Sequence, residues 1–233
     1  MDATTDFDRQ WLERLATSTE RHAGPAVCRR VLRGSDRLDA DSPRDEVIDW
    51  TRAALQRLAH HTSDRQRHDI MTGCACEYPR HRLAAIRAAY RRTGDVAVAH
   101  RMLEEQFVDF LRETLELDAA TVRLILGRGW GLAGVLRDDG TLLATKIPAS
   151  GQLRAYLETR DPERRRLLYC HCPRVRDAVR LGRTLPVTYC LCGAGFYRGI
   201  WQEILGRPVR VEVVSSVLAG DEACRILVHL PPA

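Results

Sequence analysis

Residues 189–201 have the sequence Tyr189-Cys190-Leu191-Cys192-Gly193-Ala194-Gly195-Phe196-Tyr197-Arg198-Gly199-Ile200-Trp201. This stretch predicts a Cys-x-Cys pair followed by a glycine turn and an amphipathic helix. Two more pairs have this spacing, Cys74-Ala75-Cys76 and Cys170-His171-Cys172, and both stand just before predicted helices. Random placement of eight cysteines in 233 residues yields about 0.3 such pairs. Three pairs therefore indicate a site built from thiolates.

Zinc and iron–sulfur sites both draw four protein ligands largely from thiolates. A thiolate at a helix start also faces unsatisfied N–H groups and the positive end of the helix dipole, which predicts a lowered pKa for Cys172 and Cys192. We therefore predict a metal centre, with zinc as the cofactor and an iron–sulfur cluster as the alternative. The predicted metal ligands are Cys74, Cys76, Cys170, Cys172, Cys190 and Cys192.

A small-molecule ligand is expected beside these thiols, with His171, Tyr197, Arg198 and Trp201 as the candidate binding residues. The guanidinium of Arg198 matches a carboxylate through two parallel hydrogen bonds. Trp201 could belong either to the core or to the pocket wall. Strand-like alternation of side chains could point His171 away from the two cysteines beside it. We interpret the two remaining cysteines, Cys28 and Cys224, as core residues.

Helical spacing of apolar residues dominates the chain before about residue 118. One helix is predicted to start at Ser42-Pro43, with serine as the N-cap and proline first in the helix. Beyond residue 118 the segments 121–126, 130–136 and 141–147 read as strands, the last two joined at Asp138-Asp139-Gly140. Helices are predicted over 153–168, with an interruption near Asp161-Pro162, and over 173–181 and 196–205. An extended segment is predicted over 185–189, and strands over 209–216 and 224–230.

These patterns predict one α+β domain over residues 1–233. A helical part, residues 1–118, packs against a C-terminal antiparallel sheet with helices, residues 119–233.

Composition narrows the class of protein further. The formal charge is +5, but arginines alternate with acidic residues and form no stripe, so nucleic-acid binding is not expected. Of 36 basic residues only Lys146 is a lysine, which we attribute to coding bias. No apolar run reaches the roughly 18 residues of a membrane span, and the polar start differs from a signal peptide. We expect a cytoplasmic protein, where clustered cysteines are metal ligands or redox-active thiols.

The C-terminal third contains a set of residues that suggests a family: Tyr189 to Gly193, Tyr197, Trp201, 206–209, 216–218, 220–222 and 224–226. In these residues it resembles the ending of 4-vinyl-reductase-like domains and is similar to the related L-2-amino-thiazoline-4-carboxylic acid hydrolase-like proteins. This resemblance implies an α+β domain that holds a small molecule, cysteines that bind metal and, in some relatives, hydrolysis. Matching positions are Cys190, Cys192 and Cys224, whereas the other two Cys pairs exceed what one simple motif needs.

Two other functions stay open at this point. A metal-independent hydrolase or lyase would use a low-pKa cysteine as nucleophile, with His171 or His81 as the base. A ligand-binding sensor domain would use the pocket alone. Repeated thiols without a clear catalytic partner favour the metal-binding protein.

Overall fold

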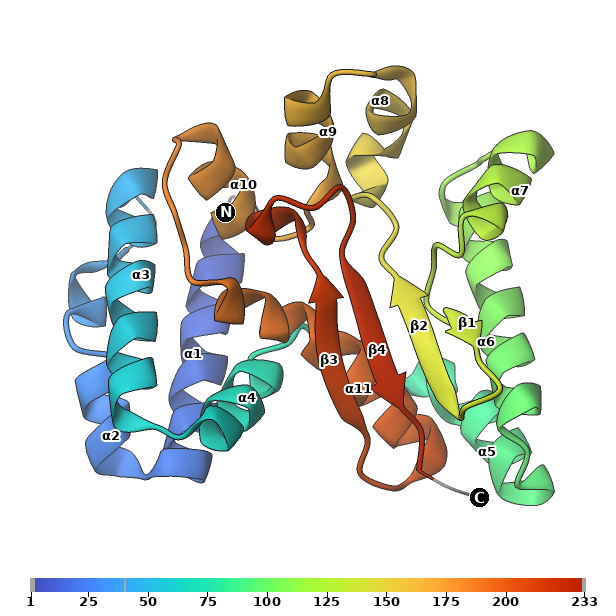
Figure 1. Cartoon of the computed structure of the whole chain (residues 1–233), viewed down its shortest axis with the longest axis horizontal. Helices are drawn as coiled ribbons and strands as arrows, with labels where there is room; N and C mark the ends of the chain where they lie inside the picture. The colour runs from blue at the N-terminus through green and yellow to red at the C-terminus, as the bar shows by residue number, and fades with distance from the viewer. Residues whose placement is uncertain (1–2, 40, 232–233) are drawn as a thin grey trace.

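The computed structural model describes residues 3–39 and 41–231 and has an α+β fold (Figure 1). The helices of the N-terminal part are α1 (Ala3–Ala23), α2 (Pro25–Val31), α3 (Arg44–His61), α4 (Asp64–Gly73), α5 (Ala84–Thr93) and α6 (Val96–Asp109). The later helices are α7 (Ala119–Gly127), α8 (Leu153–Glu158), α9 (Pro162–Tyr169), α10 (Pro173–Arg180) and α11 (Leu191–Leu205).

One antiparallel sheet lies in the C-terminal part, with the strand order β1-β2-β4-β3. Its strands are β1 (Val135–Leu136), β2 (Thr141–Thr145), β3 (Arg210–Ser215) and β4 (Arg225–His229). Short helical turns connect the elements: η1 (Ser35–Arg37), η2 (Arg80–Leu83), η3 (Phe110–Thr114), η4 (Ser150–Gln152), η5 (Val187–Cys190) and η6 (Val217–Ala219).

The division between a helical first half and a later sheet is confirmed, as is the hairpin around Asp138-Asp139-Gly140. No strand occurs in the described residues before 118. One helix start was predicted one residue early: α3 begins at Arg44, and Pro43 is its N-cap position without a side-chain bond. None of the described helices has both the length and the apolar composition that a membrane crossing needs.

The predicted strand 121–126 is wrong, because this segment forms α7. The side chain of Asp118 accepts a hydrogen bond from the Thr121 N–H and so caps the helix. Val122 and Ile125 are the buried residues, three apart, which is helical spacing. Tertiary packing of one apolar face thus overrides the β-branched composition.

Two further extended predictions are only partly right. Of the segment 130–136, only β1 is a strand, because Gly131 and Gly134 both adopt positive φ and interrupt the extended chain. The segment 185–189, predicted to be extended, ends in the helical turn η5.

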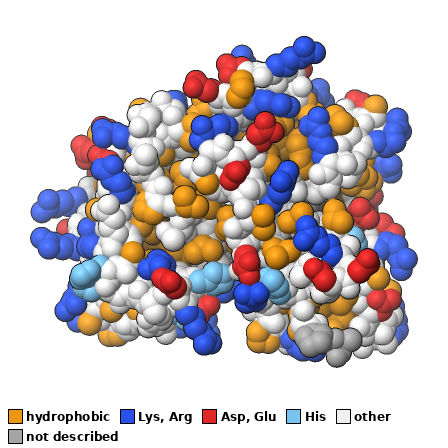
Figure 2. Space-filling model, in the orientation of Figure 1, with side chains coloured by type: hydrophobic (Ala, Val, Ile, Leu, Met, Phe, Trp, Pro, Cys, Tyr) orange, Lys and Arg blue, Asp and Glu red, His pale blue; other side chains and the backbone are white. Residues whose placement is uncertain are grey.

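Helix α11 covers one face of the sheet and lies behind β3 and β4 in Figure 1. Residues Ile200, Trp201 and Ile204 of this helix share a core with the inward side chains of β2, β3 and β4. In the view of Figure 1, α1 to α4 lie to the left of the sheet and α5 to α7 lie to its right. On the face drawn in Figure 2, basic and acidic side chains are interspersed around an apolar middle.

A buried ion-pair network ties α10 to the N-terminal helices. The side chain of Arg174 is 0% exposed, and its Nε lies 2.6 Å from Oδ1 of Asp8. Arg44 pairs with Asp8 and also with Asp177, the latter at 2.7 Å. The guanidinium carbon of Arg174 stands 4.2 Å from the ring centre of Trp11. Because breaking a buried pair leaves an uncompensated charge, this network fixes the start of α10 firmly.

Candidate functional site

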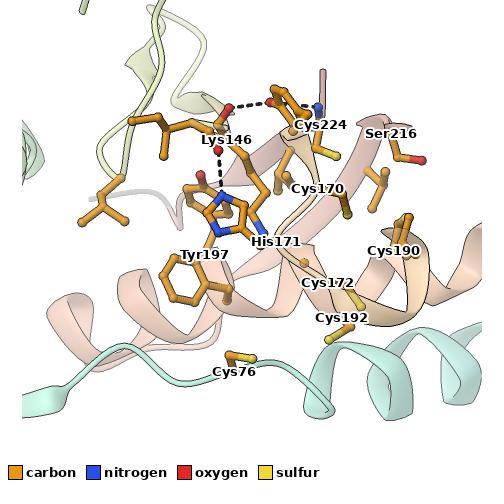
Figure 3. Close-up of a pocket in the computed structure, with 18 of the residues that line it drawn as sticks. Cys76, Lys146, Cys170, His171, Cys172, Cys190, Cys192, Tyr197, Ser216 and Cys224 are labelled. Atoms are coloured by element: carbon orange, nitrogen blue, oxygen red, sulfur yellow. Dashed lines mark hydrogen bonds between the residues drawn. The ribbon is translucent and has the colours of Figure 1, made fainter. Parts of the chain in front are cut away.

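Six of the eight cysteines line one cavity of about 360 Å³. They come from four separate segments: the loop after α4, the link between α9 and α10, the start of α11 and the residue before β4 (Figure 3). These cysteines are Cys76, Cys170, Cys172, Cys190, Cys192 and Cys224. The fold therefore joins thiols that lie up to about 150 residues apart in the chain.

The pair Cys170 and Cys172 is held between two helix ends. Cys170 is the C-cap residue of α9, and Cys172 is the N-cap residue of α10, directly before its Pro173. The Sγ of Cys172 lies 3.1 Å from the hydroxyl of Tyr189, whose ring stacks on Trp11 at 5.3 Å. The Arg174 network therefore also supports the position of Cys172.

The pair Cys190 and Cys192 lies one turn further into helical structure than predicted. Cys190 ends η5, and Cys192 is the second residue of α11, so no glycine turn precedes the helix. The Cys192 thiol donates a hydrogen bond to the backbone oxygen of Cys74 at 3.3 Å. Helix α11 approaches α4 closely here: a Cβ at Gly195 would stand 2.0 Å from the oxygen of Thr72. Glycine at that position is therefore a packing requirement.

Cys224 packs against the core, as expected, and it also lines the cavity. Tyr169 fixes it: the buried Tyr169 hydroxyl accepts from the Cys224 N–H at 3.1 Å and donates to the backbone oxygen of Lys146. The Lys146 N–H in turn donates to the Cys224 oxygen at 3.0 Å. One tyrosine thus joins the end of β2 to the start of β4 beside the cavity.

The side chain of Lys146 also lines the cavity. Its Nζ lies 5.8 Å from the ring centre of Phe196, and a Cβ added at Gly193 would be in van der Waals contact with it, at 3.6 Å. Lys146 is the only lysine in the chain, so its rarity was a signal that sequence reasoning set aside. The ammonium charge acts to lower the pKa of Cys170, Cys190, Cys192 and Cys224.

Burial nevertheless raises the pKa of all these thiols, so the predicted lowering at Cys172 and Cys192 is wrong. The pKa of Cys190 rises to about 12. Desolvation disfavours the thiolate more strongly than Lys146 or the nearby helix start favours it. Without a bound cation these cysteines are neutral thiols at pH 7.

Three predicted residues lie away from the cavity wall. Cys74 is fully buried at the end of α4, where its thiol donates to the Ile70 oxygen at 3.2 Å. Trp201 is 0% exposed within the core behind the sheet, and Arg198 lies 4.0 Å from Asp69. Of the candidates for small-molecule binding, only His171 and Tyr197 line the cavity.

His171 turns one ring nitrogen to the backbone: Nε2 lies 2.7 Å from the Ile147 oxygen (Figure 3). Desolvation, followed by the charge of Lys146, lowers the pKa of His171 to about 4. The neutral ring therefore donates from Nε2 to Ile147 and leaves Nδ1 as the acceptor. His81 lies in η2 and does not line the cavity.

Among the described residues, no three or more His, Cys, Asp or Glu side chains are arranged as a group that could hold a metal ion. Sharing a metal would therefore require cysteine side chains to leave the rotamers seen here. Comparison with family models, curated proteins and solved structures found no match for this chain.

Proposed function

We propose that this protein holds a metal ion on thiolates in the cavity and binds a small molecule beside it. The observation that supports the proposal is the meeting of six free cysteines, from four segments, on one cavity wall. If these cysteines only packed in the core, there would be no reason for them to line the same cavity. Soft thiolate donors suit zinc and iron–sulfur clusters, so the donor set fits either group.

Cys172 is the central member of the proposed ligand set. Burial is the main cause of the raised pKa values of Cys170, Cys190 and Cys192, and ionisation of Cys172 would raise each of them further, so the four thiols lie within electrostatic reach of one another. Two Cys-x-Cys pairs supply the four donors that a tetrahedral zinc ion takes. Cys224 also lines the cavity and could replace one of these four donors. Cys74 is not among the proposed ligands, because its thiol donates to the Ile70 backbone oxygen.

The chain's own groups prepare the site in three ways. Tyr169 and the Arg174 network hold the cysteine-bearing segments in place. Lys146 supplies positive charge next to the thiols. His171 has a pKa lowered by desolvation, so its ring is neutral at pH 7 and keeps one nitrogen unprotonated. If only three of the four thiolates bound the zinc ion, the fourth position would hold a water molecule of lowered pKa, and hydrolysis would then be available.

The metal-independent nucleophile is less well supported. A reactive cysteine needs a lowered pKa and a base within reach. Here burial raises the pKa of every cysteine on the cavity wall that shows a shift, and His171 has its hydrogen bond with Ile147 instead of a thiol.

Elemental analysis and an absorption spectrum of anaerobically purified protein test the proposal. Stoichiometric zinc without colour supports it as stated. A broad band near about 400 nm with iron would replace zinc by an iron–sulfur cluster. Fully folded protein that contains no metal and cannot be loaded with zinc or iron would overturn the proposal.

A further inference from the structure

Beyond its thiols, the cavity offers an apolar and largely aromatic wall. The side chains on this wall are Tyr78, Phe107, Phe110, Leu132, Phe196 and Tyr197. They surround a volume within the range that small-molecule sites occupy, roughly 300–1,000 Å³. A wall of this kind selects a ligand with an apolar body.

The charges of the cavity are all of one sign. Lys146 and Arg82 line it, and no Asp or Glu occurs among the described residues of the wall. The Lys146 ammonium faces the ring of Phe196 and forms no ion pair in the described part of the chain. Every other cation in this protein is an arginine, many of them paired with acids at the surface.

Lys146 is partly buried beside an apolar wall, where an ammonium gives up part of its hydration and an anionic partner offsets that loss. The cavity wall provides no carboxylate for this pairing. A ligand with one negative group would supply it, through a charge-assisted hydrogen bond to Nζ.

We propose that the cavity binds an apolar molecule with a single anionic group, such as a carboxylate, placed against Lys146 with its body among the aromatic rings. The inference rests on the small-molecule part of the proposed function and names its ligand class.

Titration calorimetry with two probes tests this inference on the protein as purified. Decanoate carries the anionic group, and decanamide is its neutral counterpart. We expect decanoate to bind at least about tenfold more tightly, as one charge-assisted pair provides. Lys146→Met should remove this preference, whereas Lys146→Arg should keep most of it. Arg101→Met, which removes an exposed cation outside the cavity, should leave it unchanged.

Equal affinity for the two probes in the wild type, or an undiminished preference in Lys146→Met, would overturn the inference. Circular dichroism of each variant verifies folding. If Lys146→Met does not fold, the comparison of the wild type with Lys146→Arg still tests whether a cation at this position sets the preference. Metal content is measured on the same samples. Protein that lacks metal but prefers decanoate refutes the metal centre alone, and metal-loaded protein without the preference refutes the ligand class alone.

Discussion

Burial and the charge of Lys146 have opposite effects on the pKa of the cavity thiols. Desolvation is the larger influence on the pKa of Cys170, Cys190 and Cys192, and Lys146 offsets it only in part. A divalent cation reverses this balance, because each thiolate then gains a direct bond to positive charge. The same residues are thus inert thiols without metal and strong ligands with it.

Single cysteine substitutions separate ligands from core residues. Cys190→Ala and Cys192→Ala should each lower metal content severely and reduce the melting temperature, since metal binding is linked to folding. Cys28→Ala is the control, because the Cys28 thiol only donates to the Ala16 oxygen at 3.4 Å. Metal analysis and melting curves measure both effects. Equal and mild losses at all three positions would contradict the assignment, and loss of turnover from one cysteine alone would favour a nucleophile.

The pH dependence of metal affinity follows from the raised thiol pKa values. Each ligand is protonated at pH 7 in the metal-free protein and must release its proton on binding. The zinc affinity should therefore rise with pH, by about a factor of ten per unit for each proton released. Competition titrations at pH 6.5 and 7.5 measure the slope. A zinc affinity that does not change between them would show that the thiols are not the ligands.

Tyr169→Phe removes the hydroxyl that joins Lys146 and Cys224. Two partly buried backbone groups then lose a partner, and we expect a loss of about 1–3 kcal/mol in the free energy of unfolding. Tyr78→Phe is the matched control, because the Tyr78 hydroxyl makes no hydrogen bond within the described residues. Urea denaturation of both variants measures the difference. Equal stability of the two would contradict the bridging role of Tyr169.

At the scale of elements, the contact between α4 and α11 decides where two of the cysteines lie. Gly195→Ala would place a Cβ against the backbone oxygen of Thr72. It should lower the free energy of unfolding by about 1–3 kcal/mol, because backbone atoms move less easily than a flexible side chain. Gly199→Ala, four residues on in the same helix, meets nothing within 4 Å. It should be neutral or stabilise by up to about 1 kcal/mol. Thermal unfolding compares the two, and similar losses would refute the close contact.

Element types were predictable where apolar spacing and turn residues agree. The helices before residue 118 and the hairpin at 138–140 follow from such local patterns. The segment 121–126 was mistaken for a strand because its composition is β-branched. The Asp118 cap is a local helix signal that the sequence analysis did not use, whereas the burial of Val122 and Ile125 depends on tertiary packing. Periodicity alone does not resolve so short an apolar run.

At the scale of the whole molecule, the candidate site was predictable only in part. The recurring spacing singled out the cysteine pairs, and five of their six members line the cavity. The roles of Tyr169, Lys146 and Cys224 depend on contacts between β2, β4 and α9 that no local pattern contains. The direction of the thiol pKa shifts likewise depends on burial, which only the folded chain determines.

X-ray absorption at the metal edge of anaerobically purified protein tests the central claim most directly, because it counts the sulfur atoms around the metal. A thiolate centre in the cavity predicts three or four sulfur scatterers at about 2.3 Å from a zinc ion. In Cys190→Ala and Cys192→Ala the metal signal should fall, and in Cys28→Ala it should not. A metal surrounded only by oxygen and nitrogen, or no metal at all, would contradict the account.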